Sequence, residues 1–167
     1  MSHKKTINVA LIGNPNTGKT SLFNELTGLN QKVGNYPGVT VDKKEGSSKL
    51  QKNLKAIITD LPGTYSINPT SLDESIVLKT LLNSKSEKKS DVIVVVADIE
   101  NLKRNLLLFS QIKDLEIPTV LAINMADQME RKGITLDIEL LEKELGNDVV
   151  LLSVRKEKGI DELKKAI

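Results

Sequence analysis

The sequence contains no cysteine, which excludes a disulfide framework, a thiolate metal site and a cysteine nucleophile. This absence suits a reducing compartment such as the cytosol. Aromatic residues make up only 2% of the chain, so leucine, isoleucine and valine must fill the core. The one histidine, His3, lies near the start of the chain, and the sequence contains no convincing cluster of metal ligands.

Long apolar runs and a strong net charge are also missing. The longest apolar runs, Val92 to Ala97 and Ile117 to Ile123, have the length of strands, whereas a membrane-spanning helix needs about 20 apolar residues. No signal-peptide pattern is present. The formal net charge of +2 gives no reason to expect nucleic acid as a partner.

The 167 residues can build a full-sized core, so we expect residues 1–167 to form one domain. The last residues, Ile160 to Ile167, have an amphipathic helical pattern. Because the sequence stops inside this pattern, we expect it to be a fragment of a longer polypeptide.

Apolar runs alternate with helical patterns along the chain. Strands are predicted over residues 7–12, 41–50, 54–59, 91–97, 117–123 and 149–152, and helices over 20–26, 72–82, 102–112, 138–145 and 160–167. Such alternation predicts an α/β fold with a mostly parallel sheet covered by helices on both faces. Ligands of these sheets bind beyond the carboxyl ends of the strands.

The most informative stretch runs from Gly13 to Thr20 and matches the phosphate-loop pattern G-x-x-x-x-G-K-[ST]. It stands between a predicted strand and a predicted helix, where backbone N–H groups and the helix N-terminus attract an anion. We expect Lys19 to reach the terminal phosphates and the Thr20 hydroxyl to bind Mg²⁺. The nucleotide-binding residues predicted here are Asn14, Asn16, Thr17, Gly18, Lys19, Thr20 and Ser21.

Two motifs downstream complete a phosphate and magnesium site. Asp60 ends a strand in Asp60-Leu61-Pro62-Gly63 and can hold Mg²⁺ through water, while Gly63 can offer its N–H to a γ-phosphate. Thr40 lies between the two motifs and can close over Mg²⁺ and the γ-phosphate. We therefore predict Thr20, Thr40 and Asp60 as magnesium ligands. The predicted catalytic residues are Lys19, Thr40, Gly63 and Asn16.

The base of a bound nucleotide is predicted to contact Asn124-Met125-Ala126-Asp127, which follows another predicted strand. A carboxylate such as Asp127 accepts from the paired N–H donors of guanine, and adenine has no matching pair. Asn124 can brace the neighbouring loops, and the backbone of Ser153-Val154 can touch the base oxygen. We predict Asn124, Met125, Asp127, Ser153 and Val154 as nucleotide-binding residues.

The usual catalytic devices are missing. Thr64 stands where the best-known small GTPases have a glutamine that orients the attacking water. The chain has three arginines (Arg104, Arg131 and Arg155), and none lies in either of the two loops near the phosphates. Slow intrinsic turnover, an activator supplied in trans and a bound monovalent cation remain as alternatives, and the Asn16 carbonyl oxygen is a plausible K⁺ ligand.

These motifs resemble the N-terminal G domain of the bacterial ferrous iron transporter B (FeoB) family, over essentially the whole chain. The resemblance is carried by Gly13 to Asn24, by Val33-Gly34-Asn35-Tyr36-Pro37-Gly38-Val39-Thr40-Val41, by Asp60 to Ser66, by Arg104-Asn105-Leu106 and by Asn124 to Asp127 with its methionine. It implies a P-loop NTPase with a Ras-like G domain, whose six-stranded, mostly parallel sheet has one antiparallel strand.

The resemblance also implies an activity and its cofactors. It implies Mg²⁺-dependent hydrolysis of GTP to GDP, stimulated by K⁺, with Asn16 and the backbone of Gly34 and Tyr36 as cation ligands. In the intact family protein, a helical regulatory domain and a transmembrane domain follow on the G domain, which lies on the cytoplasmic side of the inner membrane. The resemblance leaves the oligomeric state open.

Two alternatives remain from the sequence alone. One is a soluble, translation-related GTPase, against which Met125 in place of lysine and the lack of a basic appendage argue. The other is a guanine-nucleotide switch that hydrolyses slowly and needs an activator, which Thr64 and the arginine-free loops favour.

Overall fold

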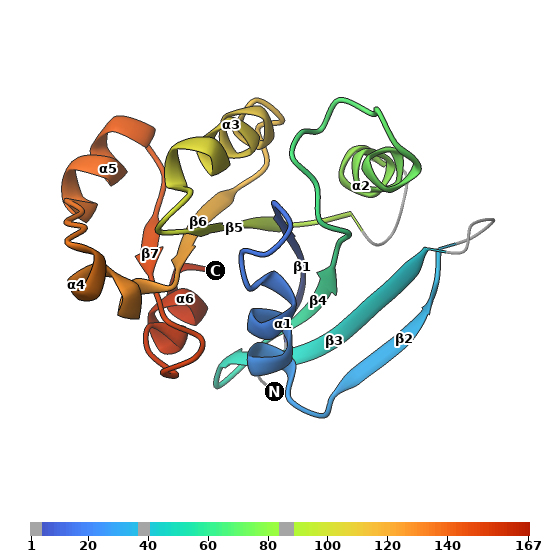
Figure 1. Ribbon diagram of the computed structural model, residues 1–167. Coiled ribbons are helices and arrows are strands. Elements are labelled where there is room, and N and C mark those ends of the chain that lie inside the picture. The colour runs from blue at the N-terminus through green and yellow to red at the C-terminus, as the bar shows by residue number, and fades with distance from the viewer. Residues whose placement is uncertain (1–4, 37–40, 84–88) are drawn as a thin grey trace.

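The computed structural model describes residues 5–36, 41–83 and 89–167 (Figure 1). Within them one sheet contains β1 (Lys5–Gly13), β2 (Gln31–Asn35), β3 (Asp42–Gln51), β4 (Leu54–Asp60), β5 (Val92–Asp98), β6 (Thr119–Asn124) and β7 (Val149–Leu151). The helices are α1 (Lys19–Thr27), α2 (Leu72–Leu82), α3 (Leu102–Lys113), α4 (Met129–Lys132), α5 (Ile138–Leu145) and α6 (Ile160–Ala166), with a 3₁₀ helix η1 (Ala126–Gln128).

The sheet has the strand order β2-β3-β4-β1-β5-β6-β7. β4, β1, β5, β6 and β7 pair in parallel, and β3 is antiparallel to both β2 and β4. The predicted α/β class and single antiparallel strand are confirmed, but the described residues contain seven strands rather than six. The additional strand is β2, whose mostly exposed residues include only one apolar side chain, Val33.

Helices cover both faces of the sheet, as predicted. Apolar residues of α2 and α3 pack on one face, and those of α1 and α6 pack on the other. β5 serves both layers, because Ile93 and Val95 face α2 and α3 while Val94 and Val96 face α1 and α6. A continuous apolar strand is what a position buried on both faces requires.

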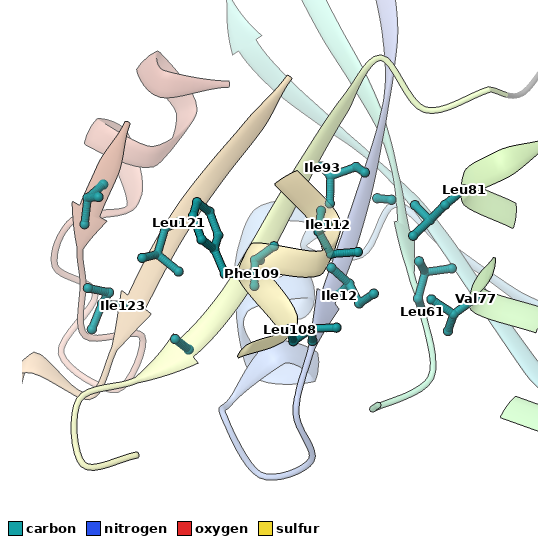
Figure 2. Close-up of a cluster of buried hydrophobic side chains, with 14 of the residues drawn as sticks. Ile12, Leu61, Val77, Leu81, Ile93, Leu108, Phe109, Ile112, Leu121 and Ile123 are labelled. Atoms are coloured by element: carbon teal, nitrogen blue, oxygen red, sulfur yellow. The ribbon is translucent and has the colours of Figure 1, made fainter. Parts of the chain in front are cut away.

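The two phenylalanines are divided between these two layers. Phe109 on α3 lies among aliphatic side chains that include Leu121 and Ile112 (Figure 2). Phe23 on α1 occupies the opposite layer with Leu22 and other aliphatic residues. Both phenylalanines are at most 1% exposed, and Leu, Ile and Val fill the remaining space in each layer.

Two helix ends follow the expected local signals. Ser71 precedes α2, and its hydroxyl accepts a hydrogen bond from the Glu74 N–H at 3.2 Å, which satisfies one of the free donors at the helix start. α5 ends at Gly146, whose φ of 66° lies in the left-handed region that glycine adopts most readily.

The topology fixes where the functional side chains meet. Gly13, Asp60, Asp98 and Asn124 are the last residues of β1, β4, β5 and β6. Because these four strands run parallel side by side, their carboxyl ends lie along one edge of the sheet.

Candidate functional site

The loop between β1 and α1 is held tightly against the ends of β5 and β6. Gly18 has φ of 81°, and a Cβ atom there would collide with the Asn124 amide. A Cβ atom on Gly13 would lie 2.5 Å from the Val96 carbonyl oxygen. The Thr17 hydroxyl donates to the Asn14 carbonyl at 3.0 Å. Glycine is therefore required at both Gly13 and Gly18 for steric reasons.

A cavity of about 380 Å³ opens at the N-terminus of α1. Seven of its eight lining residues come from the phosphate loop and the start of α1: Asn14, Pro15, Asn16, Gly18, Lys19, Thr20 and Ser21, with Gly63 as the eighth. A helix N-terminus presents unpaired N–H groups and a positive dipole end, which favour an anion such as phosphate.

Lys19 and Asp60 form an ion pair at this cavity, and the Thr20 hydroxyl donates to the second carboxylate oxygen of Asp60 at 3.2 Å. The Lys19 and Asp60 side chains are 9% and 6% exposed. Charges this deeply buried need a partner, because an isolated one has lost its hydration. Three residues predicted to bind phosphate and magnesium are thus in direct contact.

The Thr20 and Asp60 oxygens fit a magnesium ion. Mg²⁺ takes hard oxygen ligands, commonly one or two from the protein together with phosphate oxygens and water. A hydroxyl and a carboxylate oxygen lie side by side here, next to the cavity that favours an anion. The donor set therefore suits an ion held between protein and phosphate.

The loop after Asp60 brings Gly63 to the same cavity, where a Cβ atom would lie 3.3 Å from the Pro15 ring. The next residue, Thr64, is 2% exposed and fully engaged. Its N–H donates to the Gly13 carbonyl at 3.0 Å, and its hydroxyl donates to the Ser66 carbonyl at 2.8 Å. Thr64 is therefore held both by β1 and by its own loop, and its hydroxyl proton is committed to Ser66.

A second cavity, of about 340 Å³, adjoins the first. It is lined by Gly18, Ser21, Asn124, Met125, Asp127, Gln128, Val154 and Arg155. Gly18 and Ser21 line both cavities, so a single ligand with a phosphate end and a base end can extend from one into the other.

Asn124 joins the two sides of the site. Its amide nitrogen donates to the Thr17 carbonyl at 3.0 Å, and its amide oxygen accepts from the Val154 N–H at 3.1 Å. The side chain thus braces the phosphate loop against the loop after β7, as its position predicts. The Val154 N–H is engaged in this contact, so Val154 contributes the lining of the cavity rather than a free backbone donor.

Asp127 is oriented by its neighbours. The Ser153 hydroxyl donates to one carboxylate oxygen at 2.8 Å, and the Gln128 amide donates to the other at 3.3 Å. The Ser153 hydrogen bond holds the pKa of Asp127 below its ordinary value against the opposing effect of burial, with smaller help from Arg155 and Lys156. The carboxylate is therefore ionised at neutral pH, as an acceptor for two N–H groups must be.

Sequence reasoning missed some lining residues. Pro15 occupies a variable position of the loop pattern, and Gln128 lies directly after Asp127. Arg155 stands in the strand-end triplet Ser153-Val154-Arg155, which by itself signals only the end of a strand. The structure adds all three to the cavities.

The proposed K⁺ ligands are not gathered in one place. Asn16 lines the phosphate cavity with a left-handed φ of 66°. Gly34 lies in β2 and Tyr36 directly follows it, and neither lines that cavity. Figure 1 shows β2 at the edge of the sheet, away from the phosphate loop. Thr40 lies outside the described residues.

Tyr36 is instead part of the core. Its side chain is 8% exposed and belongs to the apolar layer beneath α2. The Lys43 ammonium lies 5.7 Å from the ring centroid, and the hydroxyl has no hydrogen-bond partner within the described part of the chain. Burial raises the pKa of Tyr36 to about 12, opposed by the nearby Thr80 side chain and reinforced by Asp60 and Glu45.

Neither a membrane crossing nor a clustered metal site is found in the described ranges. No helix there combines the length and apolar character that a bilayer crossing requires. No group of at least three His, Cys, Asp or Glu side chains is placed to hold a metal ion in those same residues.

Comparison with known proteins decides the family. The family model described as ferrous iron transport protein B matches residues 7–167. This chain belongs to that family. Fe(2+) transporter FeoB of Leptospira biflexa serovar Patoc is 47% identical over 160 residues, which is 96% of this chain and 23% of the relative. FeoB of Salmonella typhimurium is 43% identical over 98% of this chain, which spans 21% of that relative.

Solved structures of the family share the fold. The cytosolic domain of the T. maritima FeoB in a GDP form has a TM-score of 0.90 at 42% identity, covering 96% of this chain and 61% of that one. The T. maritima FeoB G domain has a TM-score of 0.88 at 40% identity, covering 97% and 96%. A mutant S. thermophilus NFeoB bound to mGDP has a TM-score of 0.88 at 43% identity, covering 97% and 60%. The P-loop G-domain fold is thereby confirmed.

Proposed function

We propose that this chain binds GTP and GDP with Mg²⁺ and hydrolyses GTP to GDP and phosphate. One observation carries the proposal: the phosphate cavity with Lys19, Thr20 and Asp60 adjoins a second cavity that presents the oriented carboxylate of Asp127. The GDP-bound family structures support the same ligand class.

Each residue of the site has a proposed role that follows from its position. Lys19 exchanges its contact with Asp60 for the terminal phosphates, which leaves Asp60 and Thr20 for the metal side of the site. Thr20 and Asp60 would hold Mg²⁺, which when bound would supply positive charge to offset that of the phosphates. The Gly63 N–H holds the γ-phosphate, and Thr40 supplies a hydroxyl from the loop before β3. Asp127 selects guanine, because adenine leaves its carboxylate without donors.

The proposed hydrolysis depends on a monovalent cation. Thr64 is occupied by its own loop, and no arginine belongs to the residues that line the phosphate cavity. If K⁺ binds, the side-chain amide oxygen of Asn16 would hold it, and the ion would offset negative charge beside the phosphates. Gly34 and Tyr36 would complete that site through their backbone carbonyl oxygens, which requires them to leave the positions that they hold in and directly after β2.

In the whole protein, we propose that this domain serves a ferrous iron transporter. It lies on the cytoplasmic side of the bacterial inner membrane, with a helical regulatory domain and a transmembrane domain as partners in the same protein. The family relatives named as Fe(2+) transporters support this role, and family membership argues against a translation-related GTPase.

A slower guanine-nucleotide switch is the second candidate. Thr64 favours this candidate, because its hydroxyl donates to the Ser66 carbonyl and it stands where a glutamine would otherwise orient the attacking water. In that case an activator supplies the missing group, and the domain signals through its loops before it hydrolyses.

Mg²⁺-dependent GTP hydrolysis in K⁺ and in Na⁺ buffer of equal ionic strength separates the two candidates. We expect faster hydrolysis in K⁺, and we expect Asn16→Gly, which tolerates the left-handed backbone, to lose the stimulation while keeping GDP affinity. Equal, slow rates in both buffers favour the switch. Absence of any GDP binding would overturn the guanine-nucleotide assignment itself.

A further inference from the structure

The loop that follows Gly63 is fastened along α3. The Arg104 guanidinium lies over the Tyr65 ring, 4.5 Å from its centroid. The Gln111 amide oxygen accepts a hydrogen bond from the Ile67 N–H at 3.0 Å. Arg104 and Gln111 lie about two turns apart on α3, so they occupy the same side of the helix. Two independent contacts thus hold one short loop against one helix.

The other end of this loop is fastened to the phosphate site. The Thr64 N–H donates to the Gly13 carbonyl at 3.0 Å, and Gly63 lines the phosphate cavity. The loop therefore runs from the cavity to α3, and a shift of Tyr65 or Ile67 is passed through Thr64 to Gly63.

The Arg104 contact is not a by-product of core packing. Arg104 is exposed, and Tyr65 is 45% exposed. A stacked pair of this kind restricts the loop without adding to the apolar layer beneath it. The hydrogen bond to Gln111 also fixes the orientation of the loop, because the Ile67 N–H must point at the Gln111 amide oxygen.

We propose that Arg104 and Gln111 are positioning residues that hold the loop so that the Gly63 N–H stands ready for a γ-phosphate. This rests on the proposed function, since it names how the same site distinguishes a guanosine triphosphate from a diphosphate. A ligand shifts a conformational equilibrium only through contacts that differ between the two states. GDP has no γ-phosphate for Gly63, so loosening the loop weakens triphosphate binding selectively.

The test is the ratio of affinities for a non-hydrolysable GTP analogue and for GDP, measured with Mg²⁺. Arg104→Ala and Gln111→Ala should each weaken the analogue about three- to five-fold while GDP changes less than about two-fold. The double variant should approach a ten-fold or larger loss, because both fastenings are removed.

Conservative and matched variants separate positioning from general damage. Arg104→Lys keeps a cation over Tyr65, and Gln111→Glu keeps an acceptor for Ile67, so each should recover most of the lost ratio. Lys103→Ala removes a neighbouring exposed positive charge from the same helix and should leave the ratio unchanged. Equal weakening of both nucleotides, or no change in the double variant, would overturn the proposal.

A nucleotide-free measurement distinguishes failure of this proposal from failure of the proposed function. Amide hydrogen exchange at Ile67 and Thr64 should accelerate several-fold in the double variant. The chain has no tryptophan and two tyrosines, so in a Tyr36→Phe background the tyrosine emission reports Tyr65 alone. Arg104→Ala should increase the quenching of that emission by acrylamide, a neutral quencher that Arg104 does not attract. Unchanged exchange and quenching reject the fastened loop whether or not the protein binds GTP.

Discussion

The phosphate loop is predicted to contact the nucleotide and the β2 edge to supply K⁺ ligands, and only the first of these regions lies at the phosphate cavity. Around the phosphate loop, residues from several strand ends meet, and Lys19, Thr20 and Asp60 touch one another. At the β2 edge, Gly34 stays in its strand and Tyr36 is buried beneath α2. The topology of the sheet places the residues at the strand ends. Whether Gly34 or Tyr36 can offer a backbone oxygen to an ion depends instead on the local conformation of the chain around β2.

Glycine substitutions in the two regions should give the largest contrast. Gly18→Ala should abolish nucleotide binding and lower the free energy of unfolding by at least about 2 kcal/mol, because φ is 81° and the new Cβ meets Asn124. Gly34→Ala has nothing within 4 Å of the new Cβ and should change unfolding by less than about 0.5 kcal/mol. Urea denaturation and GDP titration measure both effects. Similar losses in the two variants would remove the contrast.

Removing the charge of Lys19 in the phosphate cavity should have the second largest effect. Lys19→Ala should weaken GDP and GTP binding on the order of 10- to 100-fold, since a charge-assisted contact to phosphate is lost. It also leaves Asp60 buried without its cation, so stability should fall as well. Lys19→Ala/Asp60→Asn should regain stability without regaining affinity. Calorimetry and thermal unfolding separate the two quantities, and normal GDP affinity in Lys19→Ala would contradict the assignment.

Asp127→Asn tests the base cavity. The amide presents a donor where guanine needs an acceptor, so the preference for GDP over ADP should fall about ten-fold or more. Because the Ser153 hydrogen bond holds the pKa of Asp127 low, the preference of the unmodified chain should stay constant as pH falls from neutral to mildly acidic. Unchanged selectivity in the variant would reject Asp127 as the base-reading residue.

Tyr36→Phe should have a smaller effect at neutral pH than the substitutions at the nucleotide site, and it tests the β2 edge. Removing a hydroxyl without a hydrogen-bond partner should raise the free energy of unfolding by up to about 1 kcal/mol. The pKa of Tyr36 is 10.0 in the unfolded chain and about 12 in the folded one. The folded state therefore holds the hydroxyl proton more tightly, and the free energy of unfolding should fall as pH rises from 10 to 12. Between these limits the unmodified chain should lose about 2–3 kcal/mol more than Tyr36→Phe.

Most of the fold could be predicted because its apolar patterns are strong. The strand from Val92 to Ala97 is apolar throughout, and the stripe of Leu102, Leu106, Phe109 and Ile112 has helical spacing; both became the expected elements. β2 could not be predicted, because Gln31 to Asn35 has no alternation and becomes a strand through its pairing with β3. Pairing across the sheet supplied what local sequence preference did not.

In the candidate site, too, some features could be predicted from the sequence and others could not. Lys19, Asp60 and Asn124 follow predicted strands or lie in a fixed loop pattern, so their convergence could be anticipated from the strand order of an α/β sheet. The contacts of Ser153 and Val154 could not, since which hydrogen bonds Asp127 and Asn124 make depends on side-chain geometry. The burial of Tyr36 beneath α2 likewise depends on packing between distant segments.

The two hydrogen bonds of the Asn124 amide have a kinetic consequence. One side chain crosslinks the loop that would surround the phosphates to the loop that would flank the base. We therefore expect the two loops to open together, so that the escape of a bound nucleotide would be a single cooperative event. Its rate is then governed by how often one buried amide releases either of its partners, whatever the affinity of each cavity alone.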